Sequence, residues 1–443
     1  MQRKRVAFES LGCKLNYAET IQIEKEFLRR GFEVVESSAS ADVFVINTCT
    51  VTQSADSDCR QIVRRALRSS PDAYVVVTGC YAQGKPEEVA RIDGVHLVLG
   101  AKEKFHLFDY VDGFSKANNN GGDPGIDYHG RIFVGPVEEV VDFGPADSAV
   151  DGARTRAFLK IQDGCDYSCS YCTIPKVRGK SRSPSISFVV DQARQIAAAG
   201  FKEVVLSGVN VGDFASSDGQ SIMDLLKALE QVDGIARYRI SSIEPNLLTR
   251  EITKFVASSP KFCKHFHVPL QSGADEILKK MRRRYNSGQY RDIVNYVREL
   301  MPDAGIGADV IVGFPGESNE IFEKSVSFIE GLPLTYLHVF SYSEREGTPA
   351  AGFGGNVDPR VKRKRSEVLR MLSTKKRYDF TRHYVGKITK VLVEEEVKNG
   401  KVYGFTSNYI RVEMDANPVH ANEISDVLVT GVSDNTALGQ VIL

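Results

Sequence analysis

The chain has 443 residues, which is enough for about two to four domains that each bury a hydrophobic core. Its 57 Lys and Arg residues balance 57 Asp and Glu residues, so no overall field attracts nucleic acid and any such binding must come from local patches. The amino terminus lacks the apolar core of a signal peptide, and no apolar run is long enough to span a bilayer. We therefore expect a cytoplasmic protein without a membrane segment, whose closely spaced cysteines are metal ligands rather than disulfides.

The first hundred or so residues alternate short apolar segments with helical patterns, which is typical of parallel βαβ units. Strands are expected at residues 6–9, 43–47, 74–78 and 95–99. Between the first two strands we expect a helix that is capped by Asn16 and ends near Gly31. The pattern predicts an open, doubly wound α/β sheet in an amino-terminal domain of residues 1–115.

Three of the eight cysteines each follow the end of a different predicted strand: Cys13, Cys49 and Cys80. Because the carboxyl ends of parallel strands meet at one edge of a sheet, these thiols are expected to form a three-cornered metal site there. Any one of them alone is equally well interpreted as a small buried residue. Cys59 and Cys263 have no such placement and are interpreted as packing residues, although Cys59 is left open as a fourth ligand.

Regular alternation stops near residue 113, and the Asn- and Gly-rich stretch 118–125 is interpreted as part of a linker over residues 116–150. Regular alternation of strand and helix patterns returns in a central domain of residues 151–383. Strands are expected there at residues 158–162, 203–208, 238–242, 265–270, 306–312 and 336–341. Six strands in βα order predict a partly closed, parallel (β/α)6 barrel with its chemistry at the carboxyl ends of the strands.

A cysteine loop follows the first of these strands, with Cys165, Cys169 and Cys172 in the spacing C-x3-C-x2-C. Structural metal sites usually fill all four ligand positions, whereas sites that do chemistry keep one position open, and this loop offers only three. The alternatives are three buried thiols, which the tight spacing disfavours, or zinc with a distant fourth ligand such as His265 or His267.

Small and hydrogen-bonding residues at the other strand ends are expected to line a ligand pocket, because small residues admit a ligand close to the backbone. They are Ser207, Gly208, Ser242, Glu244, Gln271 and Val312.

Two basic segments, residues 279–284 and 360–390, break the neutral average, and the second contains twelve Lys or Arg residues. Its helical pattern indicates either a solvated face or a patch for a phosphate backbone, and in the second case replacing Arg363, Lys364 and Arg365 should weaken RNA binding. After it, four short strand patterns and the turn signal Asn399-Gly400 predict a small all-β barrel over residues 384–443, a fold that often binds RNA. These strands are expected at residues 388–394, 401–406, 410–414 and 427–430.

Taken together, these features resemble the methylthiotransferases of the radical S-adenosylmethionine (SAM) superfamily, which carry an amino-terminal cluster domain, a radical-SAM domain and a carboxy-terminal TRAM module. Four segments resemble in particular the branch that acts on threonylcarbamoyl-adenosine next to the tRNA anticodon. They are residues 11–16, 47–52, 239–244 and 404–409.

The resemblance implies that Cys165, Cys169 and Cys172 bind the 4Fe-4S cluster that cleaves SAM. It implies that a second, auxiliary 4Fe-4S cluster is bound by the other triad, Cys13, Cys49 and Cys80. Tyr171 and the strand-end residues named above would contact SAM. The implied reaction replaces the hydrogen on C2 of the adenine at position 37 with sulfur and then a methyl group.

The implied partners are the tRNA anticodon stem-loop, an electron donor of flavodoxin or ferredoxin type and a sulfur source. The sequence fixes no oligomeric state, and we favour a monomer. Two enzymatic alternatives stay open: methylthiolation of isopentenyl-adenosine in tRNA, or of an aspartate of a ribosomal protein. A metal-stabilised RNA-binding protein without catalysis is the non-enzymatic alternative.

Overall fold

The computed structural model describes residues 3–50, 53–111, 113–114, 130–144, 155–216, 218–417 and 419–442, so the predicted loop at 118–125 lies outside the described residues. The chain divides into two compact units. The amino-terminal unit comprises Met1–Ser148, Gln162–Ser183 and Ser343–Thr348, and the barrel unit comprises Ala149–Ile161, Pro184–Tyr342 and Pro349–Leu443. The cysteine loop therefore belongs to the same unit as the amino-terminal sheet. In the ranges described, no helix has both the length and the apolar character needed to cross a bilayer.

The amino-terminal unit is built on a six-stranded parallel sheet with strand order β2-β1-β3-β4-β5-β6. Its strands are β1 (Arg5–Ser10), β2 (Glu33–Val35), β3 (Val43–Thr48), β4 (Tyr74–Gly79), β5 (Leu97–Leu99) and β6 (Arg131–Phe133). Its helices are α1 (Lys14–Arg29), α2 (Gln53–Ser69), α3 (Cys80–Gly84), α4 (Pro86–Ala90) and α5 (Ile174–Arg178), with short 3-10 helices η1 (Glu103–Tyr110) and η3 (Val137–Glu139). The predicted open parallel sheet is confirmed.

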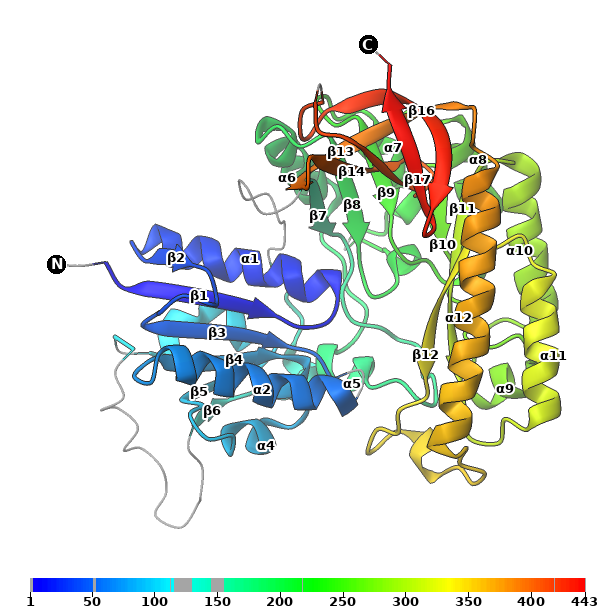
Figure 1. The fold of residues 1–443 in the computed structure, drawn as a ribbon. Coiled ribbons are helices and arrows are strands. Elements are labelled where there is room, and N and C mark those ends of the chain that lie inside the picture. Colours follow the sequence, from blue (N-terminus) through cyan, green and yellow to red (C-terminus); the bar gives the residue numbers. More distant parts are fainter. Residues whose placement is uncertain are drawn as a thin grey trace. The chain divides into compact units, whose positions relative to one another are not determined.

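Helices cover both faces of this sheet, with α1 on one face and α2 on the other (Figure 1). Phe27 of α1 packs in one core cluster, and Val63 of α2 packs in the other. Cys59 also lies in the cluster under α2, where burial raises the pKa of its thiol to about 12, as suits a packing residue. The prediction that Asn16 caps α1 is wrong, because the helix begins at Lys14 with Cys13 as its N-cap and Asn16 lies inside it.

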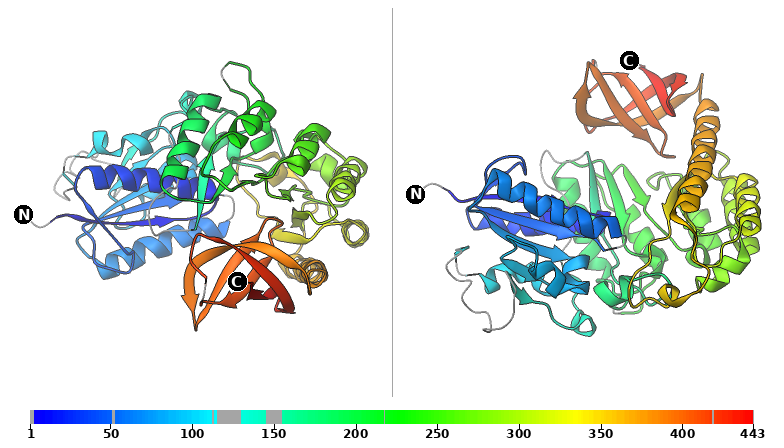
Figure 2. Two further views of the ribbon diagram at one scale, coloured as in Figure 1. Left: turned by 90° about the horizontal axis from the view of Figure 1, so that it is seen from above. Right: turned by 60° about the horizontal axis from the view of Figure 1, so that its bottom comes forward.

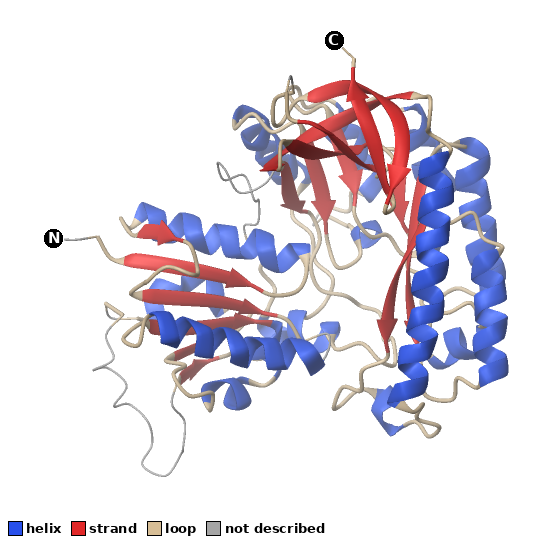
Figure 3. Cartoon of the chain, viewed as in Figure 1, coloured by secondary structure: helices blue, strands red, loops and turns tan. Residues whose placement is uncertain are grey.

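The barrel unit contains two three-stranded parallel sheets, β7-β8-β9 and β10-β11-β12, which meet through isolated parallel bridges Tyr238–Phe262 and Ser242–His267. The strands are β7 (Arg156–Lys160), β8 (Glu203–Ser207), β9 (Arg237–Ile240), β10 (His265–His267), β11 (Gly305–Val312) and β12 (Tyr336–Ser341). The helices are α6 (Ile186–Ala198), α7 (Ile222–Glu230), α8 (Arg250–Ser258), α9 (Asp275–Lys280), α10 (Ser287–Leu300), α11 (Asn319–Glu330) and α12 (Pro359–Arg382), with 3-10 helices η4 (Val211–Asp213), η5 (Pro245–Leu247) and η6 (Pro349–Gly352). All six predicted strands are present, and Figure 3 shows the helices around them.

A small closed barrel ends the chain, with strand order β13-β14-β15-β17-β16 (Figure 2). Its strands are β13 (Ile388–Lys398), β14 (Lys401–Thr406), β15 (Arg411–Asp415), β16 (Ile424–Ser433) and β17 (Thr436–Val441). Asn399 and Gly400 have φ angles of 51° and 74°, so the predicted tight hairpin turn joins β13 and β14. The predicted small barrel is confirmed, with β17 as an additional strand.

The small barrel is docked on the amino ends of the larger barrel's strands, within the same unit. Arg237 donates to the carbonyl of Phe405, and Arg239 donates to the carbonyls of Thr406 and Ser407. Arg239 also forms a buried ion pair with Glu203 at 2.8 Å. Two of the segments that carry the family resemblance, 239–244 and 404–409, therefore contact each other and hold the small barrel in place.

Candidate functional site

Cys13, Cys49 and Cys80 follow β1, β3 and β4, three strands that are neighbours in the sheet. Gly12 has a φ of +100°, and a Cβ at this position would lie only 2.6 Å from the Cβ of Cys49. Glycine therefore lets the loop of Cys13 close against Cys49. Cys49 and Cys80 are buried and Cys13 is exposed, and none of the three is joined in a disulfide within the described residues.

Asn16 holds two of these cysteine loops together. Its side-chain amide donates to the carbonyls of Leu11 at 2.8 Å and Thr48 at 2.9 Å, one just before Cys13 and the other directly before Cys49. The amide of Asn47 donates in turn to the backbone carbonyl of Asn16 at 2.9 Å. Asn16 is fully buried, so these bonds satisfy polar groups that water cannot reach.

A buried ionic network lies beside the same cysteines. Glu19 pairs with Lys104 at 2.7 Å and with Arg178 at 3.1 Å. Arg178 also contacts Asp163 at 2.9 Å and donates to the Asn16 side chain at 2.5 Å. Burial alone would lower the pKa of Arg178, but Glu19, Cys80, Asp163 and Cys13 together outweigh it and raise this pKa well above its usual value. The guanidinium therefore stays charged.

Burial raises the pKa of the Cys80 thiol, and the charge of Arg178 opposes this effect only in part. A thiol in this setting keeps its proton until a metal takes its sulfur, since a coordinated thiol is deprotonated outright. Three thiols at neighbouring strand ends, with Arg178 beside Cys80, are the type of ligand set that an iron–sulfur cluster uses.

The second triad lies in a loop that its own backbone holds closed. The amide of Cys165 donates to the carbonyl of Gly179 at 3.0 Å, and Asp163 and Arg182 form a bridge across the base of the loop. Gly164 has a φ of +70°, and a Cβ there would collide with the carbonyl oxygen of Lys180. Only glycine fits this position.

The thiols of this loop fit a cluster with one open corner. Cys165 and Cys172 are half-buried, Cys169 is buried, and none forms a disulfide among the residues described. The amide of Tyr167 donates to the sulfur of Cys165 at 3.4 Å, which is the kind of hydrogen bond that stabilises a cluster thiolate.

Helix α5 connects the two triads. It begins two residues after Cys172, packs against α3, which begins with Cys80, and ends with Arg178. Arg178 therefore links the loop that starts at Asp163 to the helix that carries Asn16 and Glu19. A further segment, 343–348, joins the same unit through Arg345, which pairs with Asp56 at 3.0 Å.

The strand-end residues predicted as cofactor contacts all lie at the carboxyl ends of β8 to β11 in the barrel unit: Ser207, Gly208, Ser242, Glu244, Gln271 and Val312. Ser207 donates its hydroxyl to the carbonyl of Val205 at 3.2 Å, and the carboxylate of Glu244 already accepts a bond from Arg283. Gln271 has a positive φ of 66°, which is uncommon outside glycine. Tyr171 lies in the cysteine loop. Their role in binding SAM stays a prediction.

A polar column that the sequence analysis missed runs along β10, β11 and β12. Asp309 accepts from His267 at 2.9 Å and lies 3.2 Å from His338, and the ring of His265 lies 2.9 Å from the hydroxyl of Tyr336. Burial raises the pKa of Asp309, but the two histidines outweigh it and hold this pKa well below its usual value. His265 and His267, considered above as distant zinc ligands, thus have partners within the barrel unit.

The basic helix α12 differs from the prediction at one position. Arg363 and Lys364 are exposed, but Arg365 is buried and pairs with Glu317 at 2.7 Å. It also donates to the side chain of Asn319 at 2.9 Å. The prediction that Arg365 belongs to a phosphate-binding face is therefore wrong, because this side chain anchors α12 to the start of α11.

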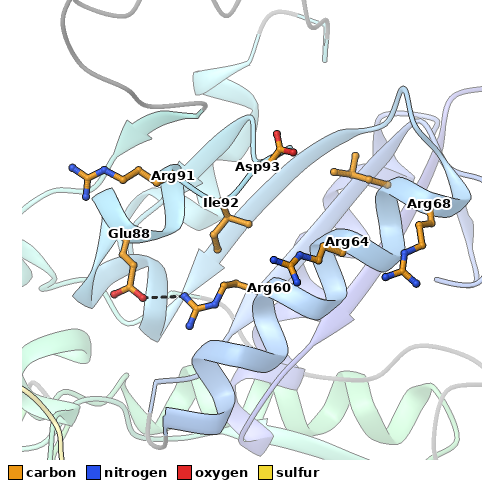
Figure 4. Close-up of a pocket in the computed structure, with 8 residues that line it drawn as sticks. Arg60, Arg64, Arg68, Glu88, Arg91, Ile92 and Asp93 are labelled. Carbon is orange, nitrogen blue, oxygen red and sulfur yellow. Dashed lines mark hydrogen bonds and ion pairs between the residues drawn. The ribbon is translucent and has the colours of Figure 1, made fainter.

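A second basic surface lies on the amino-terminal unit, where a pocket of about 670 Å³ opens between α2 and the α4 region. Arg60, Arg64 and Arg68 project from successive turns of α2 (Figure 4). Arg60 is paired with Glu88 at 3.0 Å, and Asp93 also lines the pocket. These two carboxylates offset part of the positive charge, so the pocket is a mixed ionic surface.

Comparison with known proteins identifies the chain. Residues 5–100 match the family described as uncharacterized protein family UPF0004, and residues 159–329 match the radical SAM superfamily. Threonylcarbamoyladenosine tRNA methylthiotransferase MtaB of Aquifex aeolicus is 37% identical over 411 residues, which cover 93% of this chain and 97% of that protein. The protein of the same name from Bacillus subtilis is 39% identical over 413 residues, covering 92% and 89%. The chain belongs to the radical-SAM methylthiotransferase family.

The predicted family is thus confirmed, and the chain is a radical-SAM enzyme whose cofactors are SAM and 4Fe-4S clusters. A sister enzyme, tRNA-2-methylthio-N(6)-dimethylallyladenosine synthase of Akkermansia muciniphila, is 30% identical over 452 residues, covering 98% of each chain. The solved structure of the radical SAM methyltransferase TsrM from Kitasatospora setae, with cobalamin and a 4Fe-4S cluster, has a TM-score of 0.55 at 16% identity and covers 77% of this chain and 75% of that chain. At this identity the likeness concerns the fold alone.

Proposed function

We propose that this methylthiotransferase converts N6-threonylcarbamoyladenosine at position 37 of tRNA, next to the anticodon, into its 2-methylthio derivative. The observation that carries the proposal is the 37% and 39% identity to two enzymes named for this base, over more than nine-tenths of the chain. The sister enzyme named for dimethylallyladenosine is less similar, at 30%. The segments 11–16, 47–52, 239–244 and 404–409 support the same branch.

An aromatic C–H bond is too strong and too weakly acidic for acid–base catalysis by side chains, so the difficult step needs cofactors. When bound, the two clusters and SAM supply homolytic removal of the C2 hydrogen, the sulfur atom and the methyl group. Cys165, Cys169 and Cys172 would hold one cluster with a corner left for SAM. The other triad, Cys13, Cys49 and Cys80, would hold the auxiliary cluster.

The chain's own part is to keep both groups of ligands rigid. Asn16 fixes the loops of the auxiliary triad, and Arg178 ties that region to the base of the second loop at Asp163. Rigid positioning of reacting groups lowers the barrier because their orientation is set before the reaction begins. We further propose a cytoplasmic location, an electron donor of flavodoxin or ferredoxin type, a separate sulfur source and a monomeric enzyme.

Exposed cations on α12 are the proposed contacts for the tRNA backbone. Replacing Arg363 and Lys364 together with Gln should reduce the slope of log K against log salt by about two, because each lost phosphate contact removes about one unit. Fluorescence anisotropy with a labelled anticodon stem-loop at several salt concentrations measures this slope. The fold should be unaffected, since both side chains are exposed.

Arg365→Met is the matched comparison within the same basic run. It should leave the salt slope unchanged but lower the free energy of unfolding by about 3–5 kcal/mol, because it leaves the buried carboxylate of Glu317 without its ion pair to Arg365. A urea titration measures the loss. Equal stability of the wild type and both variants would contradict the buried ion pair of Arg365. An unchanged salt slope in the double variant would mean that Arg363 and Lys364 do not contact the tRNA.

The substrate is tested by comparing modified nucleosides in tRNA from cells with and without the gene. We expect 2-methylthio-threonylcarbamoyladenosine to disappear and threonylcarbamoyladenosine to accumulate in the cells without the gene, with recovery when the gene is restored. An unchanged level would overturn the proposed substrate. Loss of 2-methylthio-isopentenyladenosine instead would assign the chain to the sister activity.

A further inference from the structure

A cavity of about 260 Å³ lies within the barrel unit, where β12, α12 and the small terminal barrel meet. We call it the seam pocket. Its lining residues are Thr335, Tyr336, His338, Arg377, Phe380, Thr381, Phe405, Asn408, Tyr409, Ile410, Arg411 and Asn435. The size is near the lower end of small-molecule pockets, about 300 Å³, so the pocket admits a single flat group rather than a double helix.

Aromatic rings form much of the pocket wall. The rings of Phe405 and Tyr409 are stacked, with centroids 4.9 Å apart and planes inclined by 22°. Tyr336 lies 6.0 Å from Tyr409, and Phe380 of α12 also lines the cavity. Proteins that bind single-stranded nucleic acid use such rings as stacking platforms for bases.

The backbone at Tyr409 is strained, with a φ of +72°, which is a rare conformation for a bulky residue. Side-chain contacts hold Tyr409 in this conformation, because its ring lies against His265 at 4.7 Å and against the guanidinium of Arg239 at 5.0 Å. Strain of this kind persists at sites where a side chain must be held in one orientation. The platform is therefore preorganised.

The charge at the pocket is positive. None of the described lining residues is acidic, whereas Arg377 and Arg411 are both exposed. Arg377 lies over the ring of Tyr336 at 5.1 Å, and Arg411 lies over Tyr403 at 4.1 Å. Within the described part of the chain neither guanidinium has a carboxylate partner, in contrast to Arg60 in the pocket of Figure 4, which is neutralised by Glu88.

Hydrogen-bonding groups complete the pocket. The side-chain amide of Asn408 is already used within the protein, since it donates to the carbonyl of Asp303 at 2.8 Å and to the hydroxyl of Tyr384. Asn435, with a φ of +63°, has a side-chain amide that makes no hydrogen bond to any residue described, and His338 is exposed at the same pocket. Asn435 is therefore available to contact polar edges of a ligand, whereas the Nδ1 atom of His338 is already 3.2 Å from Asp309.

We propose that the seam pocket binds one unpaired nucleotide of the tRNA substrate, separate from the adenine that reacts. Its base packs against the rings of Phe405 and Tyr409, and its phosphate pairs with Arg377 and Arg411. This combination of flat apolar faces, unneutralised guanidinium groups and no carboxylate suits a nucleotide, whose base is aromatic and whose backbone is anionic. The proposal rests on the proposed function, because it takes RNA as the substrate.

The test uses the full-length enzyme with a labelled, unmodified anticodon stem-loop as the probe. The double variant Arg377→Gln with Arg411→Gln should bind more weakly and lower the slope of log K against log salt by about two. Arg194→Gln on α6 is the matched control, because Arg194 is an exposed arginine that pairs with Asp191 in its own helix. It should bind like the wild type.

Photocrosslinking tests the base. Stem-loops with 4-thiouridine at single loop positions should crosslink to peptides containing Tyr336, Phe405 or Tyr409 from one position, and the double variant should lose this crosslink. An unchanged salt slope together with crosslinks only elsewhere would overturn the seam pocket while wild-type methylthiolation of tRNA continued. Failure of the wild-type enzyme to bind the stem-loop or to modify tRNA would instead overturn the proposed function, and the pocket with it.

Discussion

Replacing Cys165 with alanine should abolish methylthiolation and lower the iron content after anaerobic reconstitution from about eight to about four per chain. Cys165 is half-buried, lies in a loop held closed at its base, and its sulfur already accepts a backbone N–H. Two remaining thiols cannot hold three corners of a cluster. Iron analysis, the yield of 5′-deoxyadenosine from SAM and the modified nucleoside content of tRNA measure the loss.

Cys80→Ala in the other triad should separate the two sites. We expect it also to lose about four irons but to keep the release of 5′-deoxyadenosine, because the loop of Cys165 would remain complete. No methylthio product should form. If Cys80→Ala abolished SAM cleavage and Cys165→Ala did not, the assignment of the two triads would be reversed.

Cys59→Ala is the matched control, since Cys59 is a fully buried cysteine within the same unit. Burial in the core under α2 raises the pKa of its thiol to about 12, and its neighbours there are packing residues. The variant should keep its full iron content and activity. Its free energy of unfolding should fall only modestly, because alanine leaves a small cavity in the core. Loss of iron from Cys59→Ala would make it the fourth ligand that the sequence left open.

The position of Cys13, Cys49 and Cys80 at neighbouring strand ends could be predicted without a structure. Alternating strands and helices place the carboxyl ends of parallel strands together, so Cys13, Cys49 and Cys80 were expected at one sheet edge, and the sheet order confirms that their strands are neighbours. The local spacing of the other triad needed no fold at all. Strands β2 and β6 escaped prediction because each has only three residues and no fully buried run.

The polar residues that support the triads could not be found in the same way. Asn16 has the sequence signature of a helix cap, yet its partners are carbonyls from two loops, one of them 32 residues away. Arg178 and Glu19 are 159 residues apart, and nothing local distinguishes Arg178 from a surface arginine. Likewise, nothing in the sequence distinguishes the buried Arg365 from the exposed basic residues beside it. Buried ion pairs between distant segments depend on tertiary packing, which single-sequence patterns do not encode.

Arg178→Met should lower the free energy of unfolding of the amino-terminal unit by about 3–5 kcal/mol, because removing one member of a buried ionic network leaves uncompensated charge behind. Glu19 is fully buried and would keep its ion pair with Lys104, while Asp163 would keep its ion pair with Arg182. Methionine preserves much of the side-chain volume, so the loss should report on charge and hydrogen bonds rather than on a cavity. Urea unfolding followed by far-UV circular dichroism measures it.

The double variant Arg178→Met with Glu19→Gln distinguishes a charge effect from general damage. Removing both charges should cost less than the sum of the two single changes, by about 0.5–3 kcal/mol, because each single change already removes the direct ion pair between Arg178 and Glu19. Arg194→Met, at an exposed helix position, should change stability by no more than about 0.5 kcal/mol. Strict additivity of the Arg178 and Glu19 changes would contradict the ionic network.

The same variant tests whether one side chain serves both triads. Arg178 contacts Asn16, which fixes the loops of Cys13 and Cys49, and also Asp163, from which the second cysteine loop begins. We therefore expect Arg178→Met to release iron from both triads faster than the wild type during incubation with a chelator, whereas Cys80→Ala weakens only one. If about four irons were lost faster and the other four were retained, Arg178 would support only one triad. The proposed structural link between the two triads would then be wrong.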